Sequence, residues 1–228
     1  MIIDGHTHIG PWRGYFQEIE GKMGELIRIM DQNGIDRAVV FRSNGITNEE
    51  LLRLIDQTRF YFFWWASKGD NFQKFSEAIS GIKIHPTIEN LRADQFHNHL
   101  QFASEKKIPV LIHCGRYHPI SSYRYALNVA RTHPIPTIFA HMGGARPDIA
   151  LAAIAEAKSL SNIYFGIEGI VEPWLLKRGI GLLGPERFIF GSDFPISHPR
   201  LYLDLVDLVV AGPDRELILG GNLMSILP

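Results

Sequence analysis

Histidines stand at the end of the first apolar run of this sequence. The run closes with Asp4-Gly5-His6-Thr7-His8. Residues two apart on an extended chain point to the same side, so the imidazoles of His6 and His8 are expected to face one ion. Taken alone, a His-x-His pair is more typical of two exposed loop histidines. The metal interpretation therefore depends on further ligands that converge on the same place.

Three later apolar runs close in a similar way, with His113, His141 and Asp193. Each has an ordinary structural interpretation, because a strand-end histidine is often a satisfied core residue and an aspartate before Pro195 is typical of a turn. A buried carboxylate is costly without a partner, and a metal ion supplies one. Imidazole and carboxylate together suit Zn²⁺, and imidazole also suits Fe²⁺, Co²⁺ or Ni²⁺. Four strand ends with such groups favour a divalent-metal site.

The apolar runs alternate with segments of helical periodicity. Eight strands are predicted, at residues 2–6, 37–41, 60–66, 81–85, 109–113, 137–141, 162–167 and 187–191. The clearest helices are predicted at residues 22–33, 48–57, 92–107, 120–132, 147–159 and 199–210. Thr47 with Glu50 three residues later fits a capping box at the second of these helices.

The strand–helix alternation predicts an α/β fold. Runs such as Ala38-Val39-Val40-Phe41 are apolar on both faces, which is typical of parallel strands covered by helices. Parallel neighbours need helix-sized crossovers. Eight such units favour a compact (β/α)8 TIM barrel over an open doubly wound sheet, and the barrel would gather the polar strand ends at one mouth. No linker or second domain is visible, so residues 1–228 are expected to form one barrel.

Composition excludes several classes of protein. With 46% hydrophobic and 21% charged residues among 228, the chain is globular rather than disordered, collagen-like or disulfide-stapled. A net charge of −1 lacks the basic excess of a nucleic-acid binder. Cys114 is the one cysteine, so no internal disulfide forms and a reducing, cytoplasmic location is expected. No apolar run approaches the roughly 20 residues that span a bilayer, and the first residues lack signal-peptide features.

The motifs resemble those of the metal-dependent amidohydrolase superfamily, and most closely its single-barrel branch that includes aminocarboxymuconate semialdehyde decarboxylase. The resemblance spans nearly the whole chain. Its pieces are Asp4-Gly5-His6-Thr7-His8, Leu111-Ile112-His113, Ala140-His141-Met142-Gly143-Gly144, Gly191-Ser192-Asp193-Phe194-Pro195 and Ile218-Leu219-Gly220-Gly221-Asn222. Other branches carry a small β-sandwich built partly from residues before the first strand. Only Met1 precedes that strand here, so no β-sandwich domain is expected.

The resemblance implies a role for each strand-end residue. His6, His8, His113 and Asp193 would bind one divalent metal, with Zn²⁺ as the preferred ion. His141 would lie beside the metal and polarise the substrate or carry protons. The chemistry agrees, because a divalent ion lowers the pKa of bound water to about 7, a carboxylate can accept the water's proton, and an imidazole exchanges protons near neutral pH.

Lys83, at the end of the fourth predicted strand, is open to more than one interpretation. Binuclear members of the superfamily use a carboxylated lysine there, which would add a second metal with His113 and His141. Otherwise Lys83 pairs with a carboxylate or binds a substrate anion. His85, on the same strand face, is a candidate pocket residue.

Loop residues are the candidates for substrate recognition. Arg13 and Arg116 follow the first and fifth predicted strands and suit a carboxylate-bearing substrate. Glu168 and His198 are further loop candidates. Each has the alternative of being an ordinary exposed loop residue.

The leading functional prediction is a metal-dependent hydrolase that attacks a small-molecule ester, lactone or amide with metal-activated water. A non-oxidative decarboxylase of a small carboxylic acid on the same site is the first alternative, and a catalytically silent ligand-binding barrel is the second. A metal-dependent nuclease is disfavoured, since it would carry glutamate where Lys83 stands. The expected partner is a small molecule, with no nucleic acid and no membrane, and a homodimer is left open.

Overall fold

Eight parallel strands form the centre of the molecule. A computed structural model describes residues 1–115 and 118–228. The parallel strands are β1 (Ile3–Pro11), β3 (Arg37–Arg42), β4 (Phe60–Trp65), β5 (Gly81–Ile84), β6 (Val110–Ile112), β7 (Thr137–Phe139), β8 (Ile163–Gly166) and β9 (Phe188–Ile189). Each pairs with the next in the order β1-β3-β4-β5-β6-β7-β8-β9, and β2 (Glu20–Gly21) adds an antiparallel pair to β1. All eight predicted strands are confirmed; the two-residue β2 is too short to leave a periodic signal.

The first strand meets the segment that follows the last strand, and these contacts close the barrel. The main-chain N–H of Gly5 donates to Phe190 at 2.9 Å, and that of His8 donates to Phe194 at 2.7 Å. Thr7 and Phe194 also form a parallel bridge. The closed barrel, rather than the open sheet, is therefore the fold, as the sequence predicted.

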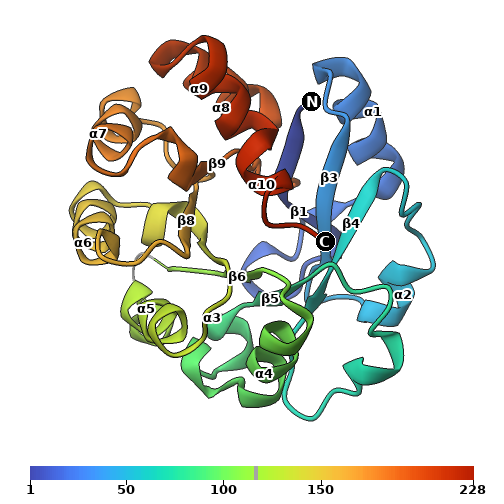
Figure 1. The fold of residues 1–228 in the computed structure, drawn as a ribbon. Helices are drawn as coiled ribbons and strands as arrows, with labels where there is room; N and C mark the ends of the chain where they lie inside the picture. The colour runs from blue at the N-terminus through green and yellow to red at the C-terminus, as the bar shows by residue number, and fades with distance from the viewer. Residues whose placement is uncertain (116–117) are drawn as a thin grey trace.

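Helices surround the barrel, as Figure 1 shows in a view along its axis. They are α1 (Met23–Asn33), α2 (Asn48–Leu52), α3 (Pro86–Glu89), α4 (His97–Lys106), α5 (Tyr123–Thr132), α6 (Pro147–Ala157), α7 (Pro173–Leu183), α8 (Pro199–Val209), α9 (Gly212–Glu216) and α10 (Asn222–Met224). Short helical turns lie at Gly14–Phe16, Phe72–Phe75, Ala93–Gln95, Pro119–Ser121, Ala140–Gly143, Pro185–Arg187 and Leu217–Gly221. None of the helices in the described ranges is long and apolar enough to cross a membrane.

Two helix boundaries differ from the sequence prediction. The helix at 48–57 ends at Leu52, because Asp56 folds the following residues into a turn and accepts the N–H of Thr58 at 2.9 Å. The segment 92–107 is divided at Phe96, whose non-helical φ and ψ of −85° and 52° separate a short turn from α4. The predicted capping box is present, with the hydroxyl of Thr47 accepting from Glu50 and the carboxylate of Glu50 accepting from Thr47.

The apolar core has two layers, because alternate residues of each strand point in opposite directions. Ala38 and Val40 of β3 belong to the layer between strands and helices, whereas Val39 and Phe41 belong to the layer inside the barrel. Trp64 and Trp65 divide in the same way, the first outward and the second inward. The inner layer includes Leu223 and Ile226 from the C-terminal segment, which crosses one end of the barrel in Figure 1.

Candidate active site

His6 and His8 come to the mouth of the barrel through an irregularity in β1. Against β3, Asp4 pairs with Ala38 and Thr7 pairs with Val40, so β1 holds one extra residue between the two pairs. Such a bulge re-aims the side chains next to it. Both imidazoles are buried, with 1% and 3% of His6 and His8 exposed.

Hydrogen bonds set the tautomer of both imidazoles. His6 Nδ1 lies 2.8 Å from Glu168 Oε1, and His8 Nδ1 lies 3.4 Å from the carbonyl of Arg42. Glu168 Oε1 also accepts the main-chain N–H of His141, and the carbonyl of Arg42 can only accept. The Nδ1 atoms of both histidines therefore carry the hydrogen. Burial lowers the pKa of His6 and of His8, which favours the neutral form of both rings. Each Nε2 therefore presents a lone pair.

These two lone pairs meet a carboxylate oxygen. His6 Nε2 and His8 Nε2 are 3.3 Å apart, and each is 3.3 Å from Asp193 Oδ1. Ligands bound at 2.0–2.1 Å to a tetrahedral ion stand roughly 3.3 Å apart, so the spacing matches a metal-ligand triangle. Three acceptors repel one another unless a cation lies among them. The donor set thus fits a divalent metal.

Asp193 is held in place by its backbone. Its φ of 59° lies in the left-handed region, which non-glycine residues adopt rarely and often at functional sites. Its N–H donates to the carbonyl of His6 at 2.9 Å. Burial alone would raise the pKa of Asp193, but interactions with His6, His8 and His141 outweigh it and lower the pKa to about 2. Asp193 is therefore ionised across the physiological range.

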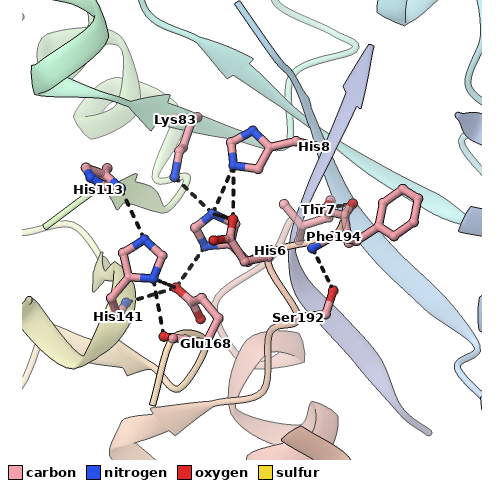
Figure 2. Close-up of polar contacts among 12 residues, drawn as sticks. His6, Thr7, His8, Lys83, His113, His141, Glu168, Ser192 and Phe194 are labelled. Atoms are coloured by element: carbon pink, nitrogen blue, oxygen red, sulfur yellow. Dashed lines mark hydrogen bonds and ion pairs between the residues drawn. The ribbon is translucent and has the colours of Figure 1, made fainter. Parts of the chain in front are cut away.

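Lys83 lies against the triangle, as Figure 2 shows. Its Nζ is 3.3 Å from His6 Nε2 and 4.6 Å from the centre of the Phe41 ring, and the side chain is fully buried. Burial lowers the pKa of Lys83 to about 8, although the charges of Asp193 and Glu168 raise it. An ammonium that donates to His6 uses the lone pair that a metal would need. Metal binding therefore requires Lys83 to leave this contact.

His141 occupies the centre of a second group of contacts (Figure 2). Its Nδ1 lies 3.2 Å from the carbonyl of Glu168, which can only accept, so Nδ1 carries the hydrogen. Its Nε2 faces His113 Nδ1 at 3.1 Å and accepts from it. Its φ of 57° is left-handed, like that of Asp193.

His113 lies beside His141 rather than in the triangle. Among residues 1–115 and 118–228, the compact groups with ligand spacing are His6, His8 and Asp193, and His6, His141 and Glu168. The structure thus brings three of the four predicted ligands together. The fourth, His113, lies against His141 instead.

The predicted substrate-binding residues are placed differently. His85 is stacked between Trp65, at 5.1 Å, and His113, at 4.0 Å between ring centres, and its Nδ1 caps α3. Arg13 is exposed, and its main chain bonds to Asn44. Arg116 lies outside the described residues. The structure therefore puts Lys83 and His85 beside the histidine cluster, whereas Arg13 is exposed and contacts Asn44.

Two buried carboxylates, Glu168 and Asp4, make contacts behind the triangle that the sequence does not reveal. The sequence indicates Glu168 only as a loop candidate and Asp4 only as part of a motif. Asp4 Oδ1 accepts the N–H groups of His6 at 3.1 Å and Ser192 at 2.9 Å, and burial raises the pKa of Asp4 to about 7. The sequence signal for Glu168 is an acidic residue directly after an apolar strand, which indicates a buried carboxylate at the mouth of the barrel.

A cavity of about 380 Å³ opens over the site. His113, His141 and Asp193 line its floor side, and its other walls include Phe16, Cys114, Ile196 and Tyr202. Tyr202 is buried and its hydroxyl accepts the N–H of Gly169 at 2.8 Å. The cavity has room for a small molecule against largely apolar walls.

Residues 76–222 match the family model described as amidohydrolase. The chain belongs to the amidohydrolase family. The resemblance inferred from the motifs is confirmed, and with it the prediction that the chain is an enzyme of a metal-dependent family. No curated protein matches the sequence.

Solved structures share the fold at low sequence identity. A probable 2-pyrone-4,6-dicarboxylic acid hydrolase from Acinetobacter baumannii, with citric acid bound, aligns with a TM-score of 0.75 at 13% identity over 99% of this chain and 98% of that one. A 2,6-dihydroxybenzoate decarboxylase from Rhizobium gives 0.73 at 15%, over 99% and 98%. A dihydroxybenzoic acid decarboxylase from Polaromonas, with manganese and 2-nitroresorcinol bound, gives 0.75 at 15%, over 99% and 96%.

Proposed function

We propose that this chain is a divalent-metal-dependent hydrolase of a small, carboxylate-bearing ester, lactone or amide. The observation that carries the proposal is the triangle of His6 Nε2, His8 Nε2 and Asp193 Oδ1, with 3.3 Å along every side. Acceptors behind both rings hold each Nδ1–H and leave the Nε2 lone pairs turned toward one point, which is how histidine ligands are oriented in metal sites.

The proposed metal ligands are His6, His8 and Asp193, with His113 as the fourth on the strength of the family resemblance. When bound, a divalent ion supplies a Lewis acid and hydroxide near neutral pH. Asp193 is ionised and its Oδ1 faces the Nε2 atoms of His6 and His8, so it is placed to take a proton from water. His141, in contact with His113 and at the cavity wall, is placed to receive a proton at Nε2 and pass it to the leaving group.

Four residues are proposed to bind substrate. Lys83 provides a cation at the base of the site, and His85 forms part of the wall behind His113. Arg13 and Arg116 remain proposals that rest on the suitability of guanidinium for a carboxylate. Apolar walls around Ile196 and Tyr202 would exclude water from the reacting atoms.

Decarboxylation on the same residues is the second candidate function. The mostly apolar cavity favours it, because a carboxylate that has lost its water is less stable and its departure as carbon dioxide relieves that cost. The Rhizobium and Polaromonas structures are decarboxylases by title, and the Acinetobacter one is a probable hydrolase. Zn²⁺ is the proposed ion, with Mn²⁺ as the alternative that the Polaromonas structure suggests.

Metal analysis combined with product analysis tests the proposal. We expect one equivalent of divalent metal per chain in the purified protein, and a rise in melting temperature when Zn²⁺ is added to the stripped protein. Two equivalents would make Lys83 a carboxylated bridging ligand. Incubation with small lactones, esters, amides and aromatic acids then separates hydrolysis from release of carbon dioxide. A protein that binds no metal and gains no stability from it would be the silent ligand-binding barrel instead.

A further inference from the structure

Glu168 connects the proposed metal triangle to His141. Its Oε1 lies 2.8 Å from His6 Nδ1 and 3.0 Å from the main-chain nitrogen of His141, and both donate to it. The carbonyl of Glu168 accepts from His141 Nδ1 at 3.2 Å. One residue therefore determines where His6 Nε2 and His141 Nε2 present their lone pairs (Figure 2).

The barrel reserves space for this carboxylate. A Cβ at Gly166 would lie 2.5 Å from Glu168 Oε2, and a Cβ at Gly191 would lie 2.8 Å from the same atom. Only 1% of Glu168 is exposed, and within the described ranges Oε2 has no hydrogen-bond partner. A buried carboxylate with one unsatisfied oxygen is unfavourable for stability. Stability of the fold alone gives no reason for a glutamate here.

A second, partly buried histidine–carboxylate pair shows the contrast. His99 Nε2 lies 2.8 Å from Asp70 Oδ1, the same distance as in the pair of His6 and Glu168. The other oxygen of Asp70 accepts from Trp64 Nε1 at 2.7 Å and from the N–H of Ser67 at 3.0 Å. Asp70 is thus fully satisfied and joins no compact ligand group within the described ranges. Hydrogen bonds satisfy both oxygens of Asp70, as expected of a structural residue, whereas Oε2 of Glu168 has no partner within the described ranges.

We propose that Glu168 is a positioning residue that orients His6 toward the metal and His141 toward the substrate at the same time. This inference rests on the proposed function, because it assigns Glu168 a task toward the metal held by His6. A carboxylate that accepts from a ligating imidazole increases the basicity of that ligand and fixes its direction. Through the shared Oε1, the same carboxylate ties the metal ligand to the group proposed to carry protons.

Two variants separate this task from folding. Glu168→Gln keeps the shape and removes the charge. Gly166→Ala keeps the carboxylate and displaces it, since the three nearest atoms to the added Cβ all belong to Glu168. Asp70→Asn is the matched control. Affinity for Zn²⁺ and the visible spectrum of the Co²⁺-loaded protein are measured for each, together with the melting temperature of the metal-free protein.

We expect Zn²⁺ affinity to fall about 10- to 100-fold in Glu168→Gln and to fall in Gly166→Ala, with an altered Co²⁺ spectrum in both. Asp70→Asn should lower the melting temperature and leave affinity and spectrum unchanged. Unchanged affinity in both Glu168→Gln and Gly166→Ala would overturn the inference. So would an equal loss of affinity in Asp70→Asn. A wild-type protein that binds Zn²⁺ but turns over no substrate would overturn the proposed function alone, whereas one that binds no Zn²⁺ would overturn both.

Discussion

At the residue scale, the proposed chemistry depends on a single carboxylate among imidazoles. Asp193 is the one carboxylate of the triangle, and its pKa is lowered to about 2, so it is ionised at neutral pH. Asp193 is proposed both as a metal ligand and as the base that accepts the proton of the reacting water. These two properties cannot be replaced by a neutral amide of the same shape.

Asp193→Asn is therefore expected to reduce turnover by about 10²- to 10⁴-fold, the usual range of general acid–base effects. The far-UV circular dichroism spectrum should stay that of the wild type, because an amide fits the same space. Steady-state kinetics on the substrate found by product analysis provides the measurement. Asp204→Asn, an exposed carboxylate paired with Arg200, is the control. Full activity in Asp193→Asn would show that the assigned role is wrong.

At the element scale, the short helix α2 supports one wall of the site. The amide of Asn48 donates to the carbonyl of Trp65 at 2.9 Å and accepts its N–H at 3.0 Å, and the ring of Trp65 stacks on His85. The capping box of Thr47 and Glu50 holds the start of this helix. The capped helix is thus connected to His85, which stacks on His113, through Asn48 and Trp65.

Thr47→Ala should lower the free energy of unfolding by about 1 kcal/mol, the usual cost of losing such a cap. Glu50 adds a pH dependence. Hydrogen bonds from Thr47 lower the pKa of Glu50 below its ordinary 4.5, so its contribution is present above pH 4.5 and is lost as the pH falls through the folded-state pKa. Urea unfolding of the wild type and Glu50→Gln should differ at pH 7 and converge as the pH falls below the lowered pKa of Glu50. A difference that grew toward acid pH would contradict this assignment.

At the scale of the whole molecule, one seam closes the barrel. The strand β1 and the segment that follows β9 come from opposite ends of the chain, and the contacts between them include the side chain of Asp4 as well as main-chain hydrogen bonds. Asp4 Oδ1 accepts from Ser192, 188 residues away, and from His6. Because His6 and Asp193 stand on the two sides of this seam, its closure also brings together the triangle of His6, His8 and Asp193.

Asp4→Ala should destabilise the fold by about 2–5 kcal/mol, since it leaves two buried N–H groups without an acceptor. Asp4→Asn keeps an oxygen at the same place and should stay near the wild type. Urea unfolding monitored by tryptophan fluorescence measures both free energies. If the alanine and asparagine variants were equally stable, Asp4 would not hold the seam.

Local patterns were enough to predict the eight strands, their parallel order and the polar residues at their ends. Apolar runs of strand length separated by helical segments leave few topologies other than a barrel, and such a barrel must gather its strand ends at one mouth. The family resemblance then followed from residues that could be read directly, such as His6, His8, His141 and Asp193.

What only the tertiary structure decided lies in contacts between distant residues. Glu168 reaches His6 across 162 positions, and His113 Nδ1 faces His141 instead of joining the triangle. The bulge in β1 and the closing contacts of Asp4 are likewise properties of two strands together. Periodicity states which face of its own element a side chain occupies, but the direction of an imidazole depends on a rotamer and on a partner that only folding brings near.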